Sequence, residues 1–135
     1  MKIRNFGIIV AAAVVTSMSA CKEQKRIDMA QVSELEKGIP KIIPSVATIH
    51  TIQKDDYSMV KIIIGDPAFY NAPEDKRKAD AVKIGQLVIS VAGADNCLTK
   101  GVLVVTKDTR SDTEMPADAM ELDMKIDSLN KAAGK

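Results

Sequence analysis

The side chains that most often carry chemistry are scarce in this chain. It has one histidine, His50, and two cysteines, Cys21 and Cys97. An acid–base or thiol site would need Asp66 to converge with His50 or Cys97 on one reacting atom. The sequence holds no Cys-x-x-Cys, His-Glu-x-x-His or Gly-x-Ser-x-Gly motif and no phosphate-binding P-loop. These residue types favour a protein that is not an enzyme, and they predict no catalytic residue, no metal and no other cofactor.

The candidates for contact with a ligand or partner are Asp66, Phe69 and Tyr70. Gly65-Asp66-Pro67 ends an apolar strand pattern directly before a helix pattern, and ligands of α/β sheets favour that edge. The two adjacent rings offer an apolar surface beside it. In the alternative interpretation, the carboxylate only shapes the turn and the rings anchor the loop in the core.

The residues before Cys21 follow a distinctive order of charge and hydropathy. Lys2 and Arg4 precede an uncharged, mostly apolar run over residues 7–15, and small residues follow up to Ala20. This order is typical of a secretory signal peptide. The apolar run is about nine residues long, which is too short for a helix that crosses a bilayer.

Met18-Ser19-Ala20-Cys21 resembles the lipobox of bacterial lipoproteins. The resemblance implies removal of residues 1–20, a diacylglycerol on the sulfur of Cys21, and an acyl chain such as palmitate on the new amine. Two or three acyl chains hold a protein at a membrane surface without spanning it. Lys22-Glu23 follows in place of an aspartate, which favours the outer membrane, on its periplasmic or its surface face. The expected location is therefore the cell envelope.

Charge and composition exclude several partners. The 19 Lys and Arg residues balance 18 Asp and Glu residues, for a net charge of +1. A nucleic-acid binder normally shows a clustered basic excess, so we predict no nucleic-acid partner. After Cys21 the aromatic residues are Tyr57, Phe69 and Tyr70 alone. They are too few for the aromatic girdles of an outer-membrane barrel.

The rest of the chain divides into three segments by its pattern. Residues 21–40 form the lipidated N-terminus and a polar tether, or else a short first helix packed on the fold, with Gly38 and Pro40 as stop signals. Residues 41–108 form one domain. Residues 109–135 form a polar linker followed by a C-terminal amphipathic helix or tail.

Two segments rich in β-branched residues, 41–53 and 57–65, flank the turn signal Lys54-Asp55-Asp56 and predict a β-hairpin. In the second strand Val60, Ile62 and Ile64 share one face, which we expect to lie in the core.

A helix is expected from about residue 72 to 92. Asn71 and Glu74 approximate a capping box at its start. Its apolar stripe contains Ala81, Ile84, Val88 and Val91. Gly93 is the expected stop.

Residues 102–105 (VLVV) form a short apolar run that predicts a third strand. The strand–helix–strand step should be a right-handed crossover between parallel strands. The predicted fold is therefore α+β. It has a small mixed three-stranded sheet, one main helix packed on that sheet, and a C-terminal helix or tail.

The C-terminal segment carries a heptad-like apolar stripe at Met115, Ala119, Leu122, Ile126, Leu129 and Ala133. Such a helix would cover the open face of the sheet or mediate self-association; a mobile tail is the third alternative.

The favoured function is that of a membrane-anchored envelope lipoprotein, a non-enzymatic binding or assembly module. Its lipid contacts the membrane, and a sheet edge or residues 115–133 contact a protein partner or a second copy. The first alternative is a small periplasmic enzyme or enzyme subunit that uses Asp66 with His50 or Cys97. The second is an accessory ligand-binding lipoprotein of a transporter.

Overall fold

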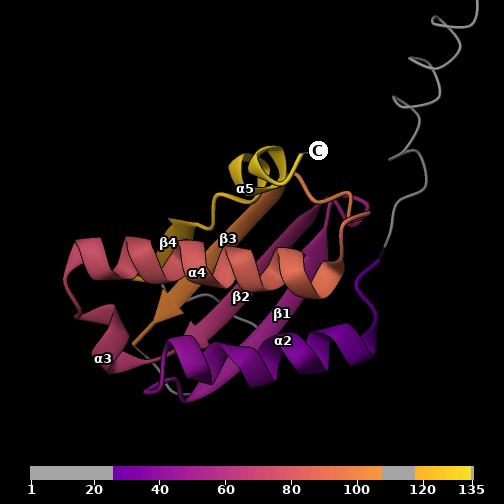
Figure 1. Cartoon of the computed structure of the whole chain (residues 1–135). Helices are drawn as coiled ribbons and strands as arrows, with labels where there is room; N and C mark the ends of the chain where they lie inside the picture. Colours follow the sequence, from indigo (N-terminus) through magenta and orange to yellow (C-terminus); the bar gives the residue numbers. More distant parts are fainter. Residues whose placement is uncertain (1–25, 108–117, 135) are drawn as a thin grey trace, which may run out of the picture.

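The computed structural model of the chain describes residues 26–107 and 118–134. The predictions for the signal peptide, for Cys21 and for most of the polar linker lie outside the described residues. Along the chain the elements are α2 (Met29–Ile42), β1 (Thr48–Lys54), β2 (Met59–Gly65), α3 (Pro67–Tyr70), α4 (Glu74–Ala92), β3 (Lys100–Thr106), β4 (Met120–Asp123) and α5 (Ile126–Ala132) (Figure 1).

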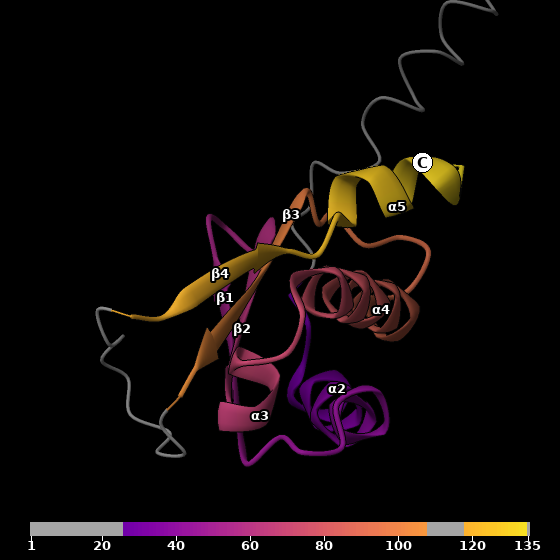
Figure 2. The same ribbon diagram turned by 90° about the vertical axis from the view of Figure 1, so that its left-hand side faces the viewer.

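A mixed sheet forms one layer of the fold, and α2 and α4 cover one of its faces (Figure 2). Its strand order is β1-β2-β3-β4. The outer pairs β1–β2 and β3–β4 are antiparallel, and the central pair β2–β3 is parallel. Helix α4 connects the two parallel strands, as the strand–helix–strand pattern predicts.

The number of strands corrects the sequence-based fold. The α+β class is as expected, but the predicted three-stranded sheet with one main helix is wrong. The described residues form a four-stranded sheet and four helices. The additional strand, β4, comes from the segment that was expected to be an amphipathic helix or a tail.

The core lies between the sheet and the two long helices. Val60, Ile62 and Ile64 of β2 are fully buried on the face toward these helices, as expected. The other large side chains that are fully buried in this cluster are Leu35, Ile39, Ile84, Val88, Leu103, Val105, Met124 and Ile126.

Helix α2 lies where the sequence indicated either a tether or a packed helix. Asp28 and Gln31 form a capping box at its start: the Asp28 carboxylate accepts from the backbone N–H of Gln31 at 2.8 Å, and the Gln31 side chain accepts from the backbone N–H of Asp28 at 2.9 Å. Leu35 and Ile39 bury the inner face of the helix. The structure therefore has the packed helix over Met29–Ile42.

The two expected stop signals lie inside α2. At Gly38 an added Cβ would come within 2.8 Å of Leu87 Cδ2, so the missing side chain lets α2 approach α4 closely. Pro40 is exposed and only two residues from the end of the helix at Ile42. The prediction that Gly38 and Pro40 end the helix was wrong because packing on α4 outweighs the local preference of both residues.

The expected capping box at Asn71 does not form. A short helix, α3, lies before α4, and the Asn71 side chain donates to the carbonyl oxygen of Pro67 at 2.9 Å, at the end of α3. Helix α4 begins at Glu74 after Pro73, without a side-chain cap. Because Asn71 closes α3, helix α4 begins about two residues later than expected, at Glu74.

The C-terminal segment is a strand followed by a short helix. Met120 and Leu122 face the helix side of the sheet, and the buried Met124 and Ile126 continue the alternation. This alternation has a period of two and is typical of a strand. The heptad interpretation was wrong because it passed over Met120, which the pairing with β3 turns toward the helix side of the sheet, and over Met124, which is fully buried just after β4.

Candidate binding site at the edge of strand β1

Asp66 is part of the fold and offers little surface to a ligand. It is 1% exposed. One carboxylate oxygen accepts from the backbone N–H of Phe69 at 3.0 Å and the other from the hydroxyl of Ser45. Asp66 thus caps α3 and holds the α2–β1 connection against it.

The two rings beside Asp66 differ in exposure. Phe69 is buried in the core, whereas Tyr70 is half-buried. The hydroxyl of Tyr70 donates to the backbone oxygen of Asp118 at 2.6 Å, and Lys107 Nζ lies 4.9 Å from the ring centroid. These contacts connect α3 to the chain just after β3 and just before β4. Of the three predicted contact residues, Tyr70 alone keeps substantial surface.

The side chains that the enzyme alternative requires, Asp66 with His50 or Cys97, do not converge on one point. His50 is exposed and lies on the sheet face opposite α2 and α4, since it pairs with Ile63. Cys97 precedes β3, whereas Asp66 follows β2. Because β2 and β3 are parallel, these two residues lie at opposite ends of the sheet, about 20 Å of strand apart.

The two edges of the sheet differ in how they are protected. Strand β4 is short, and both Glu121 and Asp123 are exposed on it. Strand β1 spans Thr48–Lys54 and carries its only formal charge at its last residue. Long, uncharged edges invite pairing with another strand, whereas short and charged edges resist it. By these criteria β1 is the open edge of the sheet.

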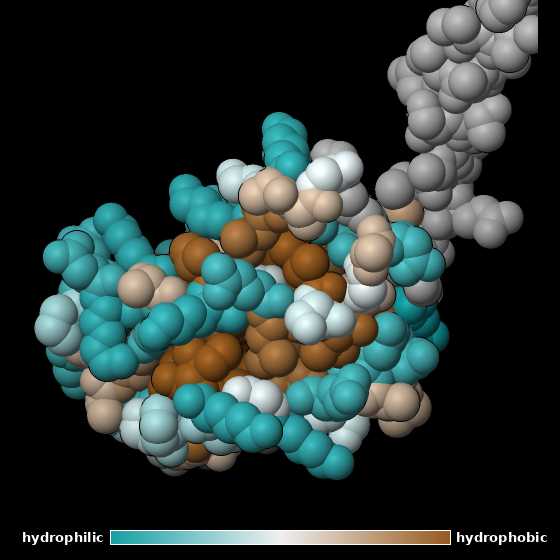
Figure 3. Space-filling model, in the orientation of Figure 1, coloured by the Kyte–Doolittle hydropathy of each residue, from teal (hydrophilic) through white to brown (hydrophobic). Residues whose placement is uncertain are grey.

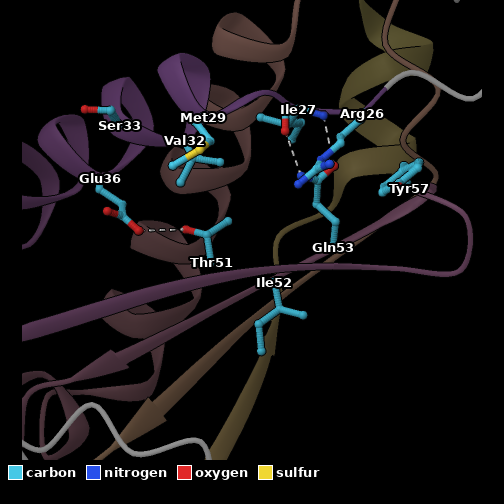
Figure 4. Close-up of a pocket in the computed structure, with 10 residues that line it drawn as sticks. All are labelled: Arg26, Ile27, Met29, Val32, Ser33, Glu36, Thr51, Ile52, Gln53 and Tyr57. Atoms are coloured by element: carbon cyan, nitrogen blue, oxygen red, sulfur yellow. Dashed lines mark hydrogen bonds between the residues drawn. The ribbon is translucent and has the colours of Figure 1, made fainter.

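A groove of about 550 Å³ runs between β1 and the first half of α2 (Figure 4). Thr51 and Gln53 point from β1 toward α2, and Ile52 points to the opposite side. The groove is lined by Arg26, Ile27, Met29, Val32, Ser33, Glu36, Thr51, Ile52, Gln53 and Tyr57.

Two lining residues are unusually exposed for their type. Met29 is 85% exposed and Tyr57 39%, and among the described residues they are the exposed large hydrophobics. Both lie at this one groove. Met29 begins helix α2 directly after its cap and projects beyond the core.

The turn between β1 and β2 presents Tyr57. Asp55, Asp56 and Tyr57 have φ angles of 52°, 55° and 68°, a left-handed conformation that costs each of them about 1–2 kcal/mol. Ser58 closes the turn by donating from its hydroxyl to the Asp55 backbone oxygen at 2.8 Å. Strain of this kind persists only where the surrounding structure holds it, often at functional sites. The sequence indicated the turn, but no signal in it marked the exposed ring.

The N-terminal side of the groove is fixed by a side-chain amide. Gln53 accepts from the backbone N–H of Ile27 and donates to the Ile27 carbonyl oxygen, both at 2.9 Å. This pairing positions Arg26, whose guanidinium lies 5.9 Å from the ring centroid of Tyr57. Farther along, Glu36 accepts from the hydroxyl of Thr51 at 3.4 Å. Opposite charges therefore lie at different points along the groove.

A second groove, of about 620 Å³, lies between α2 and α4, and Figure 3 shows its apolar floor. Ile42, Leu87 and Val91 line it together with polar residues of both helices. It meets no strand edge, and its apolar side chains are half-buried. The β1 groove is thus the stronger candidate.

Comparisons with protein-family models, with curated proteins and with solved structures found no match. Within residues 26–107 and 118–134, no helix has the length and apolar character needed to cross a membrane. The same residues hold no group of three or more histidine, cysteine, aspartate or glutamate side chains placed to bind a metal ion.

Proposed function

We propose that the chain is a lipid-anchored protein of the bacterial envelope whose folded part is a non-enzymatic binding or assembly module. The lipobox-like residues 18–21 support the anchor. The groove at β1 supports the binding role, and we propose that a protein partner binds there.

One observation carries the binding proposal. Met29, at the start of α2, and Tyr57, in the β1–β2 turn, are both exposed to solvent. Both line the groove beside the open edge of β1. Apolar side chains gathered beside the open edge of a strand are typical of an interaction surface.

Site-specific photo-cross-linking in intact cells tests this proposal. A photoreactive phenylalanine analogue replaces Met29 or Tyr57 in the full-length protein, with Gln86 on the exposed side of α4 as the matched control. We expect discrete adducts with a protein from the first two positions and none from the control. Adducts from Gln86 alone, or from no position, would contradict the proposal.

A further inference from the structure

We propose that the partner contributes an extended segment, which pairs with β1 as a fifth strand and fills the groove below α2. This inference rests on the proposed binding site and specifies how that site is used. The alternative occupant is a lipid surface.

The backbone of β1 provides the first argument. An edge strand directs alternate N–H and C=O groups away from its neighbour, so a new strand pairs with them without rearrangement. No proline interrupts Thr48–Lys54, and β1 pairs with β2 without a bulge from Thr48 to Lys54. The groove leaves the flank of β1 accessible along Thr51, Ile52 and Gln53.

The lining side chains specify which residues fit. Side chains of an added strand alternate between the two faces of the sheet. Those on the helix side would meet Met29, Val32 and Tyr57, so they should be apolar. Those on the other side would lie beside Ile52 and His50, where small polar or β-branched residues fit.

The charges give the segment a polarity. Arg26 and Glu36 lie at different points along the groove. An acidic side chain near Arg26 and a basic side chain near Glu36 would complement both. The proposed ligand is therefore an extended peptide with apolar residues at alternate positions and opposite charges toward its two ends.

The same charges disfavour a lipid surface. Among the described residues that line the groove or lie within three positions of Met29 or Tyr57 in the sequence, the basic Arg26 and Lys54 are outnumbered by the acidic Asp28, Glu36, Asp55 and Asp56. An anionic membrane attracts surfaces with a basic excess. These described residues have no such excess.

Synthetic peptides test the inference on the full-length protein in detergent. The probes are seven-residue peptides of alternating valine and threonine, with glutamate and lysine four positions apart, in both charge orders. We expect one order to bind, as measured by fluorescence anisotropy. Backbone N-methylation at alternate residues should weaken it at least tenfold, because main-chain hydrogen bonds are lost. Amide hydrogen exchange should slow in β1 and stay unchanged in β4.

A charge exchange tests the polarity. Glu36→Lys should lower the affinity for the peptide about fivefold. A peptide with glutamate in place of its lysine should restore that affinity. Glu34→Lys is the matched control, since Glu34 lines the other groove, between α2 and α4. Equal effects of the two substitutions would overturn the proposed orientation of the segment.

Two outcomes separate this inference from the proposed function. Peptide binding without protection of β1 would overturn strand addition, and cross-links from Met29 and Tyr57 would still support a binding module. If no peptide binds, the strand-addition inference is wrong, and binding of phosphatidylglycerol vesicles in that case would indicate a lipid surface as the occupant.

Discussion

Gly85 has no side chain, and this lets helix α4 pack directly against the connection between β4 and α5. It lies in α4, where an added Cβ would come within 2.2 Å of the Met124 carbonyl oxygen and 3.1 Å of Leu129 Cδ1. The neighbour of Gly85 is the β4–α5 connection, which is backbone and cannot move aside cheaply.

Gly85→Ala should therefore destabilise the protein although alanine is the better helix former. We expect the free energy of unfolding to fall by about 1–3 kcal/mol, as is typical of an overpacked site. Denaturant unfolding of the full-length protein, followed by circular dichroism, measures it. Gln86→Ala, exposed on the same helix, serves as the control. Equal stability of both variants would show that the contact is looser than described.

A buried pair of amides fixes the position of α5. Asn130 donates to Asn96 Oδ1 at 3.0 Å and to the Leu98 carbonyl oxygen at 2.9 Å. Asn96 in turn donates to the Gly93 carbonyl oxygen at 2.7 Å, at the end of α4. Because both amides are buried, each depends on these protein partners rather than on water.

Asn130→Ala removes the donor to Leu98 and one partner of Asn96. The expected loss of stability is about 1–3 kcal/mol, because buried polar groups lose hydrogen bonds. Thermal unfolding of the full-length protein measures it against Ser128→Ala, an exposed change on the same helix. A loss no larger than that of Ser128→Ala would argue against the amide network.

The pKa of Glu74 depends mainly on one neighbour, Lys78. The Lys78 ammonium hydrogen-bonds to its carboxylate at 2.9 Å and attracts its charge, and both effects lower the pKa of Glu74 from its ordinary value of 4.5. Because the pKa of Glu74 is lower in the folded than in the unfolded state, the Glu74–Lys78 pair stabilises the fold at pH values above the ordinary pKa. This stabilisation is lost as the pH falls through the lowered pKa. Lys78→Met should raise the pKa of Glu74 in a carbon-13 NMR titration. Lys83→Met should leave it unchanged.

At the scale of the elements, strongly periodic segments were predictable. Val60, Ile62 and Ile64 alternate on one strand face, and Ala81, Ile84 and Val88 repeat on one helix face; all six are buried as expected. In both segments the pattern that burial requires coincides with the intrinsic preference of the residues.

The elements that were missed depend on contacts distant in the sequence. The second half of α2 persists through Gly38 because Leu87 packs on it. The start of α4 moved because α3 captured Asn71. The open edge at β1 was foreseen only as a general property of small sheets. The exposure of Met29 and Tyr57, which makes that edge a candidate site, follows from a helix start and a left-handed turn that no spacing reveals.

The strand β4 and the heptad interpretation lead to different expectations for the stability of variants at Met124 and Ala119. Met124 is fully buried, although the heptad stripe leaves it out, whereas Ala119 belongs to the stripe and is only half-buried. Met124→Ala should cost about 2–5 kcal/mol of stability. Ala119→Ser should cost much less. Chemical denaturation of the two full-length variants compares them, and the reverse order of stabilities would favour a continuous helix.

At the scale of the whole molecule, the proposed anchor and the β1 groove lie close together. Arg26, which lines the groove, is five residues after Cys21 in the sequence. A chain of that length reaches at most about 18 Å. The proposed lipid would therefore hold the groove within that distance of the bilayer surface, and any partner would have to be reached there.

Cys21→Ala tests the anchor. We expect the variant to lose processing at residue 21 and to leave the membrane fraction after a high-salt wash, because no acyl chains remain to hold it. Cell fractionation and intact-protein mass spectrometry measure both. Cys97→Ala should keep the normal location and mass shift. Normal maturation of the Cys21→Ala protein, with retention at the membrane, would remove the basis for the proposed location.

The position of β4 in the sheet also affects how the chain folds. Among the described strands, β4 alone follows β3 in the sequence, and it is the outer neighbour of β3. Until β4 pairs with it, the almost wholly apolar β3 therefore stands at the margin of an unfinished sheet. A product that ends early would keep that margin permanently, and it should be the form of this protein most prone to aggregate and to be degraded.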